Sequence, residues 1–204
     1  MSGQPEVWTG GVADQALLAA TLAKAFHGGE LAGWLVPDPD ERAAIYPTYF
    51  GLLLDGFLAQ PNVRIEVYDA FHGVAIWAAV QTRFSLPIPG YERRLAACCD
   101  PHTPRFAAMD AAMDAHHPLG QHEYLVHLAV APKRQGRGIG SRLLQHRLAR
   151  LDPAGRVAYL EATGPRTVAL YRQHGFQLLD PVPLGDDVAL YPMHRPPNNP
   201  IQDR

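Results

Sequence analysis

The sequence predicts an α/β fold, in which helices and strands alternate along a chain of 204 residues. Apolar residues recur at helical spacing near the N-terminus, and apolar and polar residues alternate in two central segments. A later apolar strand passes through glycines into a helix. A chain of this length buries roughly 70% of its unfolded surface when it folds as one domain. We therefore expect a single domain over 1–195 and an unpacked, proline-rich tail over 196–204.

The N-terminal part of the chain predicts one strand, over 5–9, and two helices, over 12–26 and 40–58. Asp40 is a suitable N-cap for the second helix, although Pro47 falls within its first two turns. The residues expected to face inward are Leu17, Leu18, Leu22 and Phe26 on the first helix and Ile45, Tyr49, Leu52 and Phe57 on the second. The aromatic residues of this part are either the lining of a pocket for a flat or apolar amine or part of the core: Trp34, Tyr46, Tyr49 and Phe50. Because aromatic residues at helical spacing are more often core, we interpret them as packing residues.

The middle of the chain predicts an antiparallel hairpin, with strands over 63–69 and 74–82 on either side of Phe71-His72-Gly73. A loop over 84–91 and helical pieces over 95–97 and 105–115 follow, with Cys98 and Cys99 in an irregular stretch. Beyond them we expect strands over 123–130, 157–162, 176–179 and 188–193, and helices over 138–151 and 167–174.

The composition excludes several classes of function. The net charge of −2 provides no global positive field for nucleic acid or an anionic membrane. No apolar stretch is long enough to cross a bilayer, and the N-terminus lacks the pattern of a secretory signal. Because the only cysteines, Cys98 and Cys99, are adjacent and poorly placed for a disulfide, we expect a soluble, cytoplasmic protein. His116, His117 and His122 lack the spacing of a helical metal site, so we interpret them as loop surface and expect no metal.

The most informative segment is 128–141, where an apolar strand breaks at Pro132 and enters a helix through Gly136, Gly138 and Gly140. Glycine permits positive φ and the close approach of a ligand, and the first N–H groups of a helix lack internal partners. Cations at a helix N-terminus oppose the helix dipole and need an anion beside them. Four cations crowd this turn: Lys133, Arg134, Arg137 and Arg142. The segment therefore predicts a site for a phosphate or pyrophosphate.

Two common nucleotide-binding loops fit this segment badly. A P-loop needs lysine followed by serine or threonine after its last glycine, whereas Gly140 is followed by Ser141 and Arg142. The dinucleotide fingerprint needs a glycine at its sixth place, which is Ser141 when counted from Gly136. The turn therefore gives no sign of a triphosphate site and little of a dinucleotide site.

The spacing Gln135-x-x-Gly138-x-Gly140 resembles the acetyl-coenzyme A signature of the GCN5-related N-acetyltransferase (GNAT) superfamily. Within that superfamily, the segments 74–77, 159–163 and 165–176 are similar to puromycin N-acetyltransferase and related small-molecule enzymes. The likeness is strongest over 122–178, and 34–42 resembles the early helical segment of the family more loosely. The resemblance implies a mixed, mostly antiparallel sheet, flanked by helices, with strands that splay around acetyl-CoA.

The same resemblance implies that acetyl-CoA is the co-substrate and that backbone N–H groups of the strand before the turn polarise its thioester. The implied cofactor-binding residues are Leu128, Ala129, Val130, Gln135, Gly136, Arg137, Gly138, Ile139, Gly140, Ser141 and Arg166. Thr167 departs from the pattern, because relatives often carry asparagine after that arginine.

Tyr171 occupies the position of the family's tyrosine and is our expected general acid, which protonates the departing thiolate. A phenol with a pKa near 10 needs geometric help to protonate a thiolate whose conjugate acid titrates near 8.5, so part of its role is hydrogen bonding. The alternative is a core tyrosine packed beside Phe176.

The proton of the substrate ammonium needs a base, and the sequence offers Glu161, Glu123, His127 or a water molecule. Glu161 lies in an otherwise apolar strand, where it is either the base or a structural partner of Arg166 or another cation. The pleat of its strand is expected to aim His127 at the helices, away from the amine, as a satisfied core histidine.

These inferences predict an N-acetyltransferase that transfers acetyl directly from acetyl-CoA to a primary amine of a small molecule. An antibiotic-like compound is one candidate for that molecule. The alternatives are a non-catalytic acyl-CoA sensor and an acyltransferase for a peptide or protein amine or a hydroxyl group. The expected partners are the amine and, in a homodimer, a second copy of the chain, with no nucleic acid and no membrane.

Overall fold

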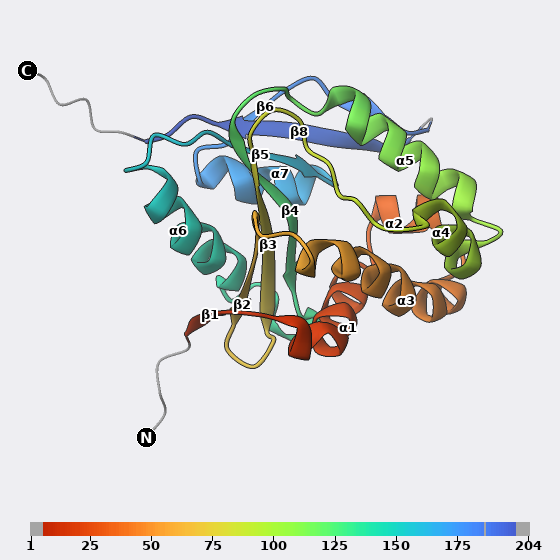
Figure 1. Ribbon diagram of the computed structural model, residues 1–204. Coiled ribbons are helices and arrows are strands. Elements are labelled where there is room, and N and C mark those ends of the chain that lie inside the picture. Colours follow the sequence, from red (N-terminus) through yellow and green to blue (C-terminus); the bar gives the residue numbers. More distant parts are fainter. Residues whose placement is uncertain (1–5, 186, 199–204) are drawn as a thin grey trace, which may run out of the picture.

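The computed structural model describes residues 6–185 and 187–198 and contains an eight-stranded sheet flanked by helices (Figure 1). The strand order is β1-β2-β3-β4-β5-β8-β6, and β7 pairs with β8. The strands are β1 (Val7–Thr9), β2 (Val63–Tyr68), β3 (Gly73–Val80), β4 (His122–Val130), β5 (Ala158–Ala162), β6 (Gln177–Leu178), β7 (Val182–Pro183) and β8 (Ala189–Arg195). Only the β4–β5 pair is parallel among the pairs described. The predicted α/β fold with a mostly antiparallel sheet is confirmed.

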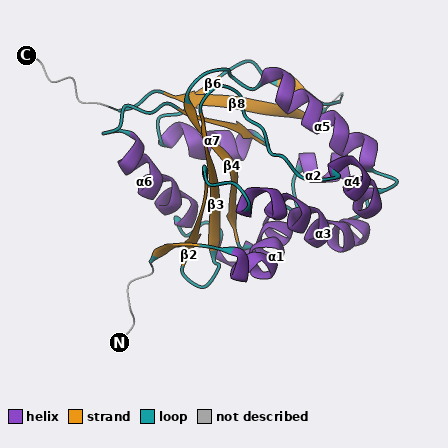
Figure 2. Cartoon of the chain, viewed as in Figure 1, coloured by secondary structure: helices purple, strands orange, loops and turns teal. Residues whose placement is uncertain are grey.

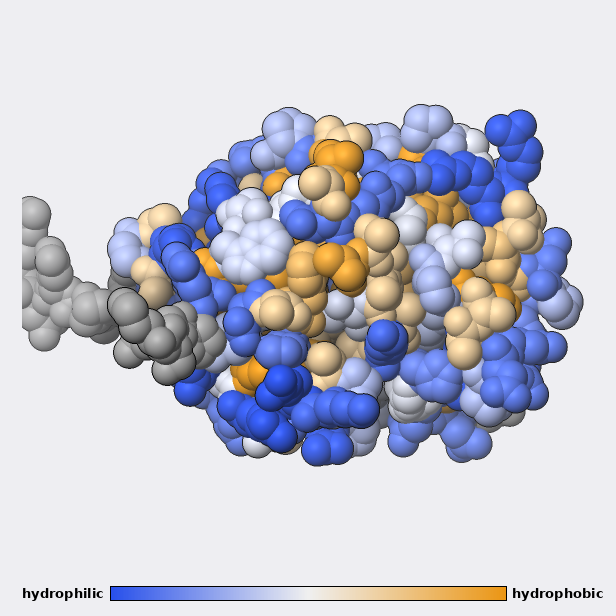
Figure 3. Space-filling view, turned by 90° about the horizontal axis from the view of Figure 1, so that it is seen from below, coloured by the Kyte–Doolittle hydropathy of each residue, from blue (hydrophilic) through white to orange (hydrophobic). Residues whose placement is uncertain are grey.

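Helices cover both faces of the sheet (Figure 2). The helices are α1 (Gln15–Ala25), α2 (Glu30–Leu35), α3 (Pro39–Leu58), α4 (Tyr91–Cys99), α5 (Thr103–His116), α6 (Ile139–Leu151) and α7 (Pro165–Gln173). The first five contribute to a hydrophobic core on one face, and α6 and α7 contribute to a second core on the other. Seen from below, the middle of the molecular surface is largely apolar and hydrophilic side chains form much of its rim (Figure 3).

The predicted N-terminal helices form, with two corrections. Asp38, not Asp40, caps α3, because its carboxylate accepts the N–H groups of Asp40 and Glu41 at 2.8 and 2.9 Å. Pro39 then takes the first helical position, where its missing N–H costs nothing. Leu17 is 55% exposed, because the inner stripe of α1 consists of Leu18 and Leu22.

Further elements differ from the sequence-based expectations. Cys98 and Cys99 lie in the last turn of α4, not in an irregular stretch, and neither α2 nor β7 follows from periodicity alone. The expectations for Pro5 and for the end of the tail, 199–204, lie outside the described residues. A single domain over 1–195 stays a prediction. No helix in the described ranges combines the length and the apolarity of a membrane span.

Strand β4 has two irregularities near its middle. It pairs with β5 only at Glu123 and Tyr124, so the two strands separate beyond that point. Its register against β3 shifts between Ile76 and Trp77, which leaves Val126 as a bulge between Leu125 and His127.

Candidate active site

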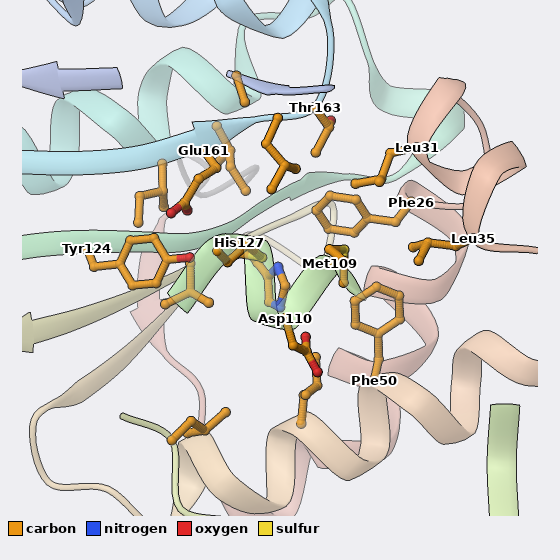
Figure 4. A pocket seen from close by; sticks show the side chains of 18 of the residues that line it. Phe26, Leu31, Leu35, Phe50, Met109, Asp110, Tyr124, His127, Glu161 and Thr163 are labelled. Carbon is orange, nitrogen blue, oxygen red and sulfur yellow. The ribbon is translucent and has the colours of Figure 1, made fainter. Parts of the chain in front are cut away.

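A cavity of about 660 Å³ opens where β4 and β5 separate and continues beneath the helices of one face. Its wall is mostly apolar, with Phe26 just after α1 and side chains of α2 and α3 opposite those of the two strands (Figure 4). Tyr46, Tyr49 and Phe50 belong to the hydrophobic core, as the sequence predicts, and they line the cavity as well. The volume falls in the range typical of small-molecule sites.

The bulge in β4 decides which side chains reach the cavity. Before it, Glu123 faces α6 and forms an ion pair with Arg147 at 2.7 Å, which places this carboxylate on the opposite side of the sheet. Because the bulge inserts one residue, His127 faces the cavity instead of following Glu123 toward α6. Glu123 is therefore not in a position to act as the base.

His127 lies among the rings of Phe26, Phe50 and Phe57, with ring centroids 5.5 to 5.7 Å away. The expectation that it points at the helices is right, and because those helices line the cavity, the ring of His127 faces the cavity as well. It is also not satisfied, because its Nε2 has no hydrogen-bond partner in the described part of the chain. Burial lowers the pKa of His127 to about 4, which keeps the ring neutral.

Glu161 of β5 is the buried carboxylate at the strand separation, with a side chain only 4% exposed. Its Oε1 has no hydrogen-bond partner among the described residues. Arg166, the structural partner that the sequence suggests for it, is exposed and takes part in none of the ion pairs within the described ranges. The nearest cation-forming group is His117, whose Nδ1 lies 3.6 Å from Oε1, beyond hydrogen-bond length.

His117 and His122 are buried, which corrects their interpretation as loop surface, whereas His116 is exposed as expected. The chain turns inward at the end of α5 and places His117 against the rings of Tyr124 and Tyr159, at 4.6 and 5.0 Å. Burial raises the pKa of both phenols, and the nearby Glu161 carboxylate raises it further. No local sequence signal marks these histidines, because the packing joins residues distant in the chain.

The hydrogen bonds of these two histidines fix their tautomers. His122 Nδ1 lies 3.0 Å from the carbonyl oxygen of Gly120 and must donate to it, since a carbonyl only accepts. Burial lowers the pKa of His122, so its Nε2 carries no proton and accepts from His117 Nε2 at 3.0 Å. With the Nε2 hydrogen of His117 committed to His122, its Nδ1 is the ring nitrogen that faces Glu161 Oε1.

Tyr171 of α7 also lines the cavity and is buried, with its ring edge-to-face on Phe176 at 5.8 Å. It is thus both packed, as the alternative held, and available to a ligand. Burial raises the pKa of Tyr171, so the phenol keeps its proton at neutral pH. Thr167, which departs from the resembled pattern, lines the same cavity, and its hydroxyl donates to the Gly164 carbonyl at 2.8 Å.

The glycine turn between β4 and α6 has the geometry of an anion site. Gly136 and Gly138 have φ values of +73° and +76°, and open space surrounds the position of a Cβ at each. The N–H groups over 136–141 donate to no backbone carbonyl within the described residues. These amides gather at the positive end of the α6 dipole, where phosphate groups bind.

Side chains brace the turn and surround it with positive charge. Gln135 Nε2 donates to the Val130 carbonyl at 3.2 Å, which ties the turn to the end of β4. Ser141 Oγ is hydrogen-bonded to His174 Nε2 at 3.0 Å, so its hydroxyl is partly committed. The side chains of Lys133, Arg134 and Arg137 are exposed and form no ion pair in the described ranges.

Comparison with known proteins gives results consistent with this geometry. A model of the acetyltransferase (GNAT) domain matches residues 104–178. The chain is 28% identical to a protein described as histone acetyltransferase HPA2 and related acetyltransferase from Corynebacterium glutamicum, with 97% of this chain and 98% of that chain covered and a TM-score of 0.71.

Two further solved structures share the fold at lower identity. Arylalkylamine N-acetyltransferase 2 from Aedes aegypti is 14% identical, with 96% of this chain and 100% of that chain covered and a TM-score of 0.66. The ribosomal-protein-S18-alanine N-acetyltransferase from Escherichia coli is 14% identical, with 98% and 99% covered and a TM-score of 0.55. At this identity the likeness extends to the fold alone.

Proposed function

The chain belongs to the GNAT superfamily of acetyltransferases, and from this premise we propose that it transfers an acetyl group from acetyl-CoA to a primary amine of a small molecule. The observation that carries the proposal is the buried Glu161 Oε1, which lacks a hydrogen-bond partner in the described part of the chain and lies beside a cavity of ligand size. A buried acceptor without a donor is costly, and a substrate ammonium supplies that donor.

The residues of the glycine turn fit the nucleotide end of acetyl-CoA. The free amides over 136–141 suit its pyrophosphate, and Arg137 and Arg166 are exposed cations able to reach its phosphates. Beyond its pairing with β5, β4 has backbone groups that bond to no second strand, so Leu128, Ala129 and Val130 can serve the pantetheine and the thioester carbonyl.

Glu161 and His117 together provide the base. The ammonium donates to Glu161 Oε1, and its proton passes to the pair formed by this carboxylate and His117 Nδ1. The amine lone pair then forms the C–N bond with the thioester carbonyl carbon, and the C–S bond breaks. Tyr171 stabilises the thiolate and donates its proton, which makes CoA-SH the leaving product, and the second proton that the acylated nitrogen loses restores the phenol.

Direct transfer within a ternary complex is favoured over an acyl-enzyme. Cys99 is buried, and burial raises the pKa of its thiol, with a further contribution from the adjacent Cys98. A thiol with a raised pKa is a poor nucleophile at neutral pH. Neither cysteine lines the cavity.

The proposal is tested by titrating CoA calorimetrically and then measuring CoA thiol release with amines, peptides and alcohols. We expect CoA to bind and small amines to release thiol most efficiently, because the cavity is sized for a small molecule. Binding without thiol release from any acceptor would identify an acyl-CoA sensor. Thiol release only with peptides or hydroxyl compounds would contradict the proposed substrate class, and absence of CoA binding would overturn the proposal entirely.

A further inference from the structure

The cavity contains a second carboxylate, partly buried, which the proposed chemistry does not use. Asp110 projects from α5 and lines the cavity on the side of α3 and α4 (Figure 4). It accepts one hydrogen bond, from the Tyr91 hydroxyl at 2.7 Å. In the described ranges, none of the ion pairs includes Asp110.

No positively charged side chain among the described residues pairs with the Asp110 carboxylate. Burial raises the pKa of Asp110, which the hydrogen bond from Tyr91 only partly offsets. Burial also raises the pKa of Tyr49 and Tyr91, and the Asp110 charge raises both further. An ionised carboxylate in an apolar wall costs several kcal/mol unless a cation pairs with it. This end of the cavity is therefore complementary to a positive charge.

The spacing along α5 places Asp110 far from the reacting end. His117 follows Asp110 by seven positions, about 10 Å along a helix axis and about two turns, so both lie on the same face. Met113 and Asp114 line the cavity between them, and the Asp114 carboxylate forms an exposed ion pair with Arg83 at 2.6 Å. Across from Met113 the wall consists of apolar side chains, among them Phe50 and Leu53. Apart from that ion pair, whose two charges offset each other, the wall between Asp110 and the Glu161 end of the cavity is largely apolar.

We propose that Asp110 forms a subsite for a second positively charged nitrogen of the acceptor, so that the preferred substrate is a diamine with an apolar middle. This inference rests on the proposed function, because it assumes that the reacting amine binds at Glu161. The second nitrogen donates to the Asp110 carboxylate, which keeps the bond from Tyr91, while the apolar middle of the substrate displaces water from the cavity wall.

The test compares straight-chain monoamines, from butylamine to decylamine, with the α,ω-diamines of matched length. We expect kcat/KM to favour the diamine by about 10-fold or more at the best length, since a hydrogen bond between charged groups contributes more than a neutral one. Asp110→Asn keeps an acceptor for Tyr91 but removes the charge, so it should abolish this preference, mainly through KM for the diamine.

The diamine-to-monoamine ratio is measured within each variant, so a smaller folded fraction cancels and the test remains decisive. Asp55→Asn is the matched control, because Asp55 is a carboxylate on α3 that pairs with Arg94 and does not line the cavity. It should leave the ratio unchanged. An unchanged ratio in Asp110→Asn, or no diamine preference in the native protein, would overturn the subsite while leaving the proposed function intact. Failure of every amine to react would instead contradict the proposed function.

Discussion

Gly138 and Gly140 belong to the same turn, but the structure predicts opposite effects when each is replaced by alanine. Gly138 has a φ of +76°, a left-handed conformation that costs an alanine about 1–2 kcal/mol. The reduced freedom of the unfolded chain offsets about 0.4–1 kcal/mol of that cost. The expected net destabilisation of Gly138→Ala is therefore about 1 kcal/mol, or about 2–4 °C in Tm for a chain of this size.

Gly140 lies within the first turn of α6, in a helical conformation. A Cβ there would lie 3.6 to 3.8 Å from Leu170, Leu128 and Val130, which is ordinary van der Waals contact. Replacing a helical glycine with alanine stabilises a helix by about 0.5–1 kcal/mol, so Gly140→Ala should raise Tm slightly. The added methyl faces the sheet and α7, away from the free amides, so the affinity for CoA should not change.

Differential scanning calorimetry measures the stability of both variants, and calorimetric titration measures their affinity for CoA. Gly138→Ala should bind CoA more weakly than the native protein, because relief of its strain moves the amides that begin α6. The reasoning would be refuted by a Gly138→Ala variant as stable as the native protein, or by a Gly140→Ala variant that loses CoA binding.

Three further predictions concern the cavity. Tyr171→Phe should lower kcat by about 10²-fold or more with little change in CoA affinity. A steady-state assay that finds kcat unchanged in this variant would exclude Tyr171 as the general acid. Glu161→Gln should lower kcat by about 10²–10⁴-fold at neutral pH. This loss of kcat should shrink as the pH approaches the pKa of the substrate amine, near 10.4, because less of the amine then needs a base. A loss of kcat that is the same at every pH would indicate a structural role for Glu161. The folded protein lowers the pKa of His127 from about 6.5 to about 4. The free energy of unfolding should therefore be highest above pH 6.5 and decrease by up to about 3 kcal/mol as the pH drops toward 4. Urea unfolding of His127→Leu should show a smaller loss over this pH range, and equal losses in both proteins would contradict the buried neutral ring.

The sequence predicts those elements whose signals are local. The hairpin of β2 and β3 and the strand–turn–helix around Gly138 follow from alternation, helical spacing and backbone freedom within short windows. The predicted cap of α3 is wrong by two residues, because Asp38 and Asp40 both precede good helix formers and only Pro39 distinguishes them. The prediction for Cys98 and Cys99 is wrong because the flanking prolines obscure a helix that packing against α3 stabilises.

Some residues of the candidate site also have local sequence signals, and others do not. Glu161, Tyr171 and the glycine turn are predicted from motif and resemblance, and the structure places the first two in the lining of one cavity. His117 could not be identified, because its role depends on a bond to His122 and a contact with Glu161, which lies on a strand far away in the sequence. Asp110 gives no sequence signal either, since an acidic residue on a helix is usually exposed.

The bulge at Val126 connects these observations. A regular strand would place Glu123, Leu125 and His127 on one face, where His127 would meet the α6 side of the sheet. The inserted residue instead sends His127 to the cavity while Glu123 keeps its ion pair with Arg147. The separation of β5 from β4 begins just before this bulge, after Tyr124, and it exposes Glu161 to the same cavity. The carboxylate that we propose as the receiver of the amine is therefore accessible because the sheet is interrupted there, a long-range property that alternation along a single strand does not encode.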